Sequence, residues 1–249
     1  MGAFRFSCNF FGVSSGDAFV DKCRRAEEYG YDAVLAPDHL GAPAPFPLLV
    51  AAAAATERLR VGTLVLNVPF WNPALLAREV ATTDILTGGR LEVGLGAGHM
   101  KWEFDEAGIG WKPFSTRADQ LATTITELER FFTTDFEPLP EGAAPRPVQR
   151  RGFGGSGPPL LVGGTGDRIL RIAAAHADIV SVAGVYQLAG QGRFGWERQS
   201  RPRNACGSLG SARDSGRTRS SGICSFRWWS RPEIVAAPQR SWSHASVRT

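Results

Sequence analysis

The stretch LLVGGTGDRILRIAAAHADIV, residues 160–180, decides the fold because it passes from a strand pattern to a helix pattern and back. Residues 160–162 are continuously apolar, as in a buried strand. The turn GGTG at 163–166 leads into a segment with apolar residues at helical spacing, and Ile179–Val182 is apolar again. A strand, a helix and a second strand in immediate succession indicate a parallel β/α unit.

The same alternation extends toward the N-terminus. We expect earlier strands at Phe4–Phe11, Ala33–Ala36, Val61–Leu66 and Leu91–Leu95. A first helix is expected directly after Ser15, and three further helices at Pro47–Leu59, Ala74–Leu86 and around Leu121–Phe132. This makes six strands, whereas a (β/α)8 barrel needs eight. The predicted fold is therefore a (β/α)8 TIM-barrel type within residues 1–190, incomplete, with about six β/α units.

The tail, residues 191–249, differs from the body in composition. It contains 11 Arg, 11 Ser and 4 Trp but no apolar period of 2 or 3.6. A disordered basic tail is one interpretation, although such segments are normally poor in aromatic residues. A shifted reading frame is the other. In that frame the last base of each codon is read with the first two bases of the next codon. From Arg193 this permits a strand end followed by an amphipathic helix, and over Phe226–Arg231 it permits an apolar strand. The lost stretch would supply strands seven and eight.

Charge and composition exclude several classes of protein. The net charge of +4 divides into +8 in the tail and −4 in residues 1–190, so the body has no basic face for nucleic acid. The longest apolar run, Leu48–Ala55, is too short for a membrane span. We see no secretory signal. The cysteines, at positions 8, 23, 206 and 224, lack metal-ligand spacing, so we expect no metal and a cytoplasmic location.

Polar and glycine residues collect where the predicted strands end. In β/α barrels the carboxyl ends of the strands and the loops after them form the active-site face. Glycines entering a helix also let backbone N–H groups approach a phosphate, although a tight strand-to-helix connection needs the same residues. The residues expected on that face are Asp38, His39, Asn67, Ala97, Gly98, His99, Gly163 and Gly164.

Four segments together resemble the luciferase-like monooxygenase family. They are DAVLAPDHL (32–40), GTLVLNVPFWNPALLARE (62–79), GRLEVGLGAG (89–98) and the 160–180 stretch, in the order and spacing of that family. The body is most similar to its coenzyme F420 branch, typical of actinobacteria. The resemblance implies hydride transfer between the reduced deazaflavin C5 and a small organic substrate, and a homodimer. It also implies a non-prolyl cis peptide at Leu64–Val65, beside the cofactor. FMN is the alternative cofactor.

Three side chains are candidates for the chemistry. His39 ends a strand, where a histidine can donate or accept a proton near neutral pH. Asp38 either orients His39 or contacts the deazaflavin ring, or it caps the next helix. His99 stands where relatives often place a carboxylate, which leaves the second acid/base position open. His39 and Asp38 are the predicted catalytic residues.

The remaining expectations concern the surroundings of the site. The loop Asp135–Pro159 is rich in Pro and Gly and is expected to shape the substrate pocket. Trp71 and Trp102 either line this pocket or serve in packing. A rival hypothesis is a non-catalytic remnant, because six parallel strands leave two unpaired edges.

Overall fold

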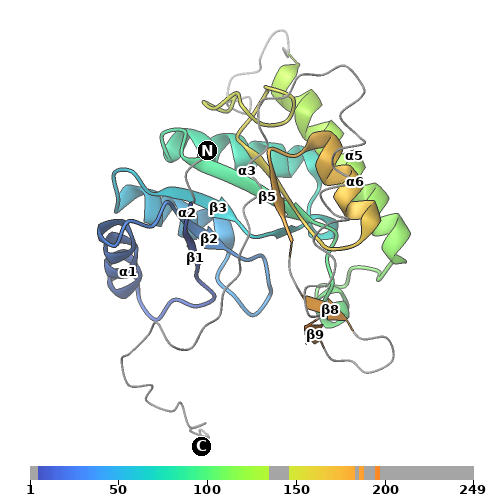
Figure 1. Cartoon of the computed structure of the whole chain (residues 1–249), viewed down its shortest axis with the longest axis horizontal. Helices are drawn as coiled ribbons and strands as arrows, with labels where there is room; N and C mark the ends of the chain where they lie inside the picture. Colours follow the sequence, from blue (N-terminus) through green and yellow to red (C-terminus); the bar gives the residue numbers. More distant parts are fainter. Residues whose placement is uncertain (1–4, 135–145, 183–184, 188–193, 197–249) are drawn as a thin grey trace, which may run out of the picture.

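A computed structural model describes residues 5–134, 146–182, 185–187 and 194–196. Six strand positions form one curved parallel sheet with helices on its outer side (Figure 1). The strands are β1 (Ser7–Asn9), β2 (Ala33–Ala36), β3 (Arg60–Thr63) with β4 (Leu66–Asn67), β5 (Leu91–Gly96), β6 (Leu160–Gly163) and β7 (Ile179–Ser181). The third position counts as two strands, and the Leu64–Val65 peptide between them is cis.

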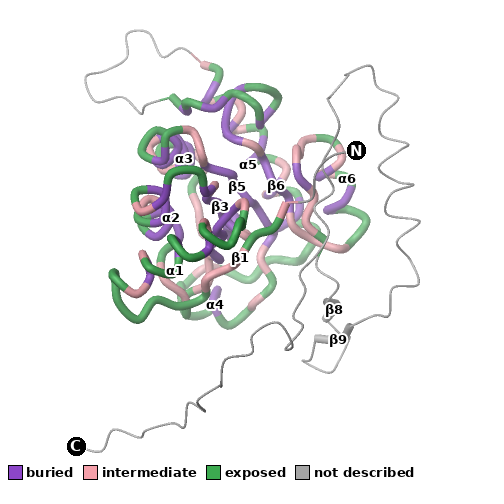
Figure 2. The backbone as a smooth tube through the Cα atoms, turned by 60° about the vertical axis from the view of Figure 1, so that its left-hand side comes forward, coloured by how far each residue is buried: buried purple, intermediate pink, exposed green. Residues whose placement is uncertain are grey.

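The helices follow the strands as a β/α barrel requires. They are α1 (Gly16–Glu28), α2 (Pro45–Ala54), η1 (Val68–Phe70), α3 (Pro73–Leu86), α4 (Lys101–Glu106), α5 (Phe114–Thr133) and α6 (Asp167–His176). Their inner faces and the central strands form the buried core (Figure 2). No described helix is long and apolar enough to cross a membrane.

Local sequence signals explain the helix ends. Ser15 caps α1, since its Oγ accepts a hydrogen bond from the Ala18 N–H, and Gly30 follows the helix with φ +80°. The prediction for α2 was shifted, because the helix begins at Pro45 and ends at Ala54 rather than Leu59. The Arg90 guanidinium accounts for the early end: it donates to the carbonyl oxygens of Ala53 and Leu59.

The first strand is shorter and more exposed than the sequence predicts. Phe4–Phe11 was expected to be a buried strand, but β1 spans Ser7–Asn9, and Phe6 and Phe11 are 65% and 54% exposed. The physical reason is pairing: among the described strands β1 pairs with β2 alone, and β7 pairs with β6 alone. Within the described residues the sheet is therefore a partial barrel whose two edge strands, β1 and β7, each pair on one side only.

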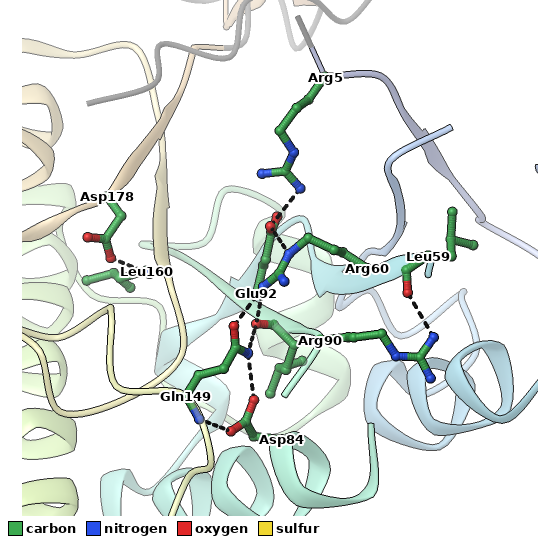
Figure 3. Close-up of polar contacts among 10 residues, drawn as sticks. Arg5, Leu59, Arg60, Asp84, Arg90, Glu92, Gln149, Leu160 and Asp178 are labelled. Carbon is green, nitrogen blue, oxygen red and sulfur yellow. Dashed lines mark hydrogen bonds and ion pairs between the residues drawn. The ribbon is translucent and has the colours of Figure 1, made fainter. Parts of the chain in front are cut away.

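The segment before β6 lies at the opposite end of the sheet from the one predicted. Residues 135–145 lie outside the described part, but Gln149 donates to Asp84 Oδ1 and to the Leu91 carbonyl, at the amino ends of the strands (Figure 3). A loop that leads from a helix into a strand belongs on that side. The described part of Asp135–Pro159 therefore shapes no pocket on the carboxyl-end face.

The chain after β7 is described only in two pieces. Val185–Gln187 (β8) and Phe194–Trp196 (β9) pair antiparallel and belong to no part of the large sheet. The rest of the predicted 191–249 tail lies outside the described residues. The frameshift hypothesis stays a prediction, which the nucleotide sequence across codons 185–195 tests.

Candidate functional site

A small pocket opens at the carboxyl ends of β2 and β4 and beside the loop after β5. Its volume is about 110 Å³. Seven of the residues predicted for the site line it, and two further residues do so as well. The lining consists of Asp38, His39, Leu64, Val65, Leu66, Asn67, Gly98, His99 and Glu103.

His39 is held by a carboxylate that the sequence analysis did not single out. Its Nδ1 lies 2.8 Å from Glu103 Oε1, and the same oxygen accepts the Leu40 N–H at 3.2 Å. Glu103 belongs to the short helix α4 and is 1% exposed. His39 Nε2 makes no hydrogen bond to the described residues. A carboxylate on one imidazole nitrogen fixes the ring and its tautomer, so that the other nitrogen is the one left for proton exchange.

Glu103 also bears on the second acid/base position, which the sequence left open at His99. This chain has His99 where relatives often place a carboxylate, and Glu103 of the next helix supplies a carboxylate to the same pocket. The His39 and His99 rings meet edge to face, with centroids 5.6 Å apart. Burial lowers the pKa of His99, and His39 lowers it further, so His99 favours its neutral form.

Asp38 links two strand ends, and its predicted contact with the deazaflavin ring stays a prediction. Its Oδ2 accepts the Asn67 N–H at 3.0 Å and the Trp71 Nε1–H at 2.8 Å, so it joins the end of β2 to the end of β4. It caps no helix, since α2 has no side-chain cap. Burial raises the pKa of the Asp38 carboxyl despite these hydrogen bonds. Orientation of His39 falls to Glu103 rather than Asp38.

Neither of the two predicted tryptophans lines this pocket. Trp71 bonds Asp38 and packs edge to face on Phe46, with centroids 5.5 Å apart. Trp102 is 53% exposed and does not line the pocket. Trp71 therefore serves in packing, which was the alternative role expected for both tryptophans.

The glycines predicted for the site have different roles in the structure. Gly98 has φ +75°, and a Cβ there would lie 2.3 Å from Asn67 Oδ1, so only glycine fits. Gly163 lies beside Val65, which a Cβ would approach to 2.9 Å. The Gly164 N–H donates to the Ser181 carbonyl at 3.0 Å, and a Cβ there would meet Ile169 at 2.6 Å. Gly164 therefore serves the strand-to-helix connection, and its N–H is not available to a phosphate. Ala97 is buried and does not line this pocket.

Buried polar atoms without a partner mark this face. Within the described residues these atoms are Asn9 Oδ1, Asn67 Oδ1 and two nitrogens of Arg117. Asn9 ends β1 and Asn67 ends β4, so both asparagines stand at carboxyl ends of strands. Buried polar groups are normally hydrogen-bonded. Asn67 Oδ1 in particular is an acceptor that a ligand N–H would satisfy.

A partial parallel β/α barrel with its polar groups at the strand carboxyl ends defines a barrel enzyme scaffold. The family model for luciferase-like monooxygenases matches residues 9–195, and the chain belongs to that family.

Three relatives illustrate the match. An F420-dependent glucose-6-phosphate dehydrogenase of Amycolatopsis mediterranei is 35% identical over 125 residues, which are 47% of this chain and 38% of the relative. The oxygenase component of a flavin-dependent trigonelline monooxygenase of Acinetobacter baylyi is 30% identical over 146 residues, 54% of this chain and 40% of the relative. An F420-dependent secondary alcohol dehydrogenase, solved with an F420-acetone adduct, shares the fold with a TM-score of 0.61 at 21% identity, over 73% of this chain and 58% of that one.

The chain thus spans about two fifths of the length of the curated relatives it matches.

Proposed function

We propose that this chain forms the part of an F420-dependent oxidoreductase that holds the reactive end of the cofactor and exchanges a proton with the substrate. The observation that carries the proposal is the His39–Glu103 pair, 2.8 Å apart, in a pocket beside the unpartnered Asn67 Oδ1. The names of the F420-dependent relatives support the cofactor. The predicted homodimer and cytoplasmic location stay predictions.

The described residues fit one part of a deazaflavin. Leu64 and Val65 provide an apolar wall, Gly98 leaves no side chain in the way, and Asn67 Oδ1 offers an acceptor to a ring N–H. A pocket of about 110 Å³ is smaller than the roughly 300–1,000 Å³ of ordinary ligand sites. We therefore assign to these residues the reactive end of the cofactor and not its side chain.

When bound, the deazaflavin accepts or returns a hydride at C5. The protein's part is proton transfer. His39 Nδ1–H donates to Glu103, so Nε2 accepts the hydroxyl proton of an alcohol as its carbon loses hydride, and returns that proton in the reverse direction. Glu103 touches His39 and not the substrate, so it is a positioning residue.

Cofactor titration of the purified chain tests the proposal, with F420 and FMN added separately and binding followed by cofactor fluorescence. We expect saturable F420 binding that Asn67→Ala weakens. Tighter binding of FMN would favour a flavin monooxygenase, as the trigonelline relative's name suggests for that protein. Binding of neither cofactor would support the rival hypothesis of a non-catalytic remnant.

Glu103→Gln tests the positioning role. We expect kcat to fall about tenfold or more while the affinity for the cofactor stays within about twofold, because only the histidine loses its charged partner. Equal loss of cofactor binding would show that Glu103 instead shapes the pocket.

A further inference from the structure

The N-terminus of α5 lies on the same face of the sheet as the pocket. The chain reaches it from the carboxyl end of β5 by way of α4. Its N-cap is Pro113, which offers no side-chain acceptor, and the first turn holds no acidic residue. Phe114, Ser115 and Thr116 are exposed, and the N–H groups of a first turn have no acceptor within the helix. This end of a 20-residue helix therefore presents donors and a partial positive charge.

A buried cation stands at the same place. Arg117 is 6% exposed, and neither Nε nor Nη1 has a hydrogen-bond partner among the described residues. Its guanidinium carbon lies 3.7 Å from the centroid of the Trp111 ring, two positions before the N-cap. Helical side chains point back toward the helix N-terminus, which is where this stacking holds the guanidinium. Stacking on a ring uses none of the N–H donors of Nε and Nη1, which stay without a partner among the described residues.

Carboxylates near Arg117 are hydrogen-bonded or ion-paired to other residues. Glu103, the buried carboxylate of α4, bonds His39 and the Leu40 N–H. Asp105 pairs with Lys101, and Asp119 pairs with Arg168. Lys112, exposed and directly before the helix, adds another positive charge. Buried cations are normally paired, so the arrangement calls for an anion.

We propose that Lys112, Arg117 and the first-turn N–H groups of α5 form an anion-binding subsite for a phosphate or carboxylate group of the molecule bound at the pocket. Helix N-termini bind such groups through their free N–H donors, and arginine binds them through its planar fork. The Arg117 guanidinium carbon also lies 5.9 Å from the centroid of the Phe104 ring, and Phe104 is the chain neighbour of Glu103, which lines the pocket, so the charge lies close to the site. The identity of the bound molecule rests on the proposed function, but the subsite itself does not.

Calorimetric titration of the purified chain with inorganic phosphate, and separately with succinate, tests the subsite at constant ionic strength set with chloride. We expect saturable binding of at least one of the two anions. Arg117→Gln should weaken it about tenfold or more, and Lys112→Gln about threefold, because the exposed lysine is screened by salt. Arg78→Gln, which removes an exposed arginine on α3, is the matched control and should change nothing.

Arg117→Lys covers the case in which Arg117→Gln does not fold. It keeps the charge and loses the planar fork, so binding should fall by an intermediate factor. Lys112→Glu, at an exposed position, should abolish binding without loss of fold. Absence of saturable binding by the unmodified chain, or unchanged affinity in Lys112→Glu and in the folded Arg117 variants, would overturn the proposal.

A second titration, in the presence of F420, separates the two sources of the anion. If F420 displaces the bound anion competitively, the subsite holds an anionic group of the cofactor. If both bind together, it holds the substrate. Anion binding by a chain that binds neither F420 nor FMN would leave the subsite standing while the proposed function fails.

Discussion

The two ends of the sheet treat their buried polar groups in opposite ways. At the amino ends, Glu92 Oε1 accepts from Arg5 at 2.7 Å and from Arg60 at 2.6 Å, and Arg60 also donates to Gln149 (Figure 3). Gln149 in turn donates to Asp84 through both its backbone N–H and its side chain. These groups form one connected network.

At the carboxyl ends Asp38 and Glu103 are hydrogen-bonded, but other buried polar side-chain atoms have no partner among the described residues. In the described part of the chain, the buried side-chain nitrogen and oxygen atoms without a hydrogen-bond partner all belong to Asn9, Asn67 or Arg117, which lie at the carboxyl-end side of the sheet. An unsatisfied buried group costs about 1–3 kcal/mol. A fold that satisfies its buried polar groups at one end and leaves some without partners at the other separates stability from ligand binding, as β/α barrels generally do.

The largest effect that this comparison predicts is on stability at the amino end. Asp84 is fully buried and accepts two hydrogen bonds from Gln149. Asp84→Ala strands both donors and leaves a small cavity, so the free energy of unfolding should fall by about 3–5 kcal/mol. Urea denaturation measures it.

Asp119→Ala is the control for that experiment. It removes an exposed carboxylate whose ion pair with Arg168 is worth less than about 1 kcal/mol. If both substitutions cost the same, the buried network at the amino ends does not carry the stability assigned to it.

The next effect is on catalysis at the carboxyl end. His39→Ala should cut F420-dependent turnover by about 100-fold, the usual range for loss of a positioned acid or base. His39→Gln can still donate to Glu103 but cannot exchange a proton, so it should be equally slow. Turnover is measured by cofactor fluorescence. Near-normal rates in the Gln variant would assign His39 to packing rather than proton transfer.

The contrast between the two ends also explains what the sequence could predict. Strand and helix positions follow from apolar runs and glycine turns, and the residues at strand ends follow from the parallel order, so seven of the predicted residues meet in one pocket. Glu103 was out of reach because α4 has six residues, too few for a periodic pattern to show which of its acids faces inward.

Arg117 and Asp38 show the same limit in other ways. Arg117 lies on the buried face of α5 amid apolar positions, and its burial becomes visible only when Trp111 stacks on it. Asp38 was located correctly, but its partners, Asn67 and Trp71, are set by how β2 and β4 lie together. The side of the sheet taken by Gln149 follows from chain direction, a rule that the prediction for the loop before β6 did not use.

A smaller effect is expected for Asn67, where a substitution separates ligand binding from stability at the carboxyl end. Asn67→Ala removes an acceptor without a partner and leaves the backbone N–H that bonds Asp38. Stability should change by less than about 1 kcal/mol, while F420 affinity falls about five- to tenfold, in line with one lost hydrogen bond. Thermal melting and cofactor titration measure the two quantities. A large loss of stability would mean that Asn67 belongs to the fold rather than to the site.

The smallest effect is the pH dependence of Asp38. Burial raises the pKa of this carboxyl in the folded state. In the unfolded chain Asp38 has the ordinary aspartate pKa of about 3.9, so it loses its proton at a lower pH than in the folded chain. Asp38 then contributes stability below that pH, and this contribution is lost as the pH rises through the folded pKa. Asp38→Asn keeps an oxygen to accept the Asn67 and Trp71 donors but does not titrate. The difference in unfolding free energy between the variant and the unmodified chain should grow in favour of the variant from about pH 4 upward and then level off. A difference that is flat, or that grows in the opposite direction, would show that the carboxylate is stabilised where it lies, and that the carboxyl end satisfies its charges as fully as the amino end does.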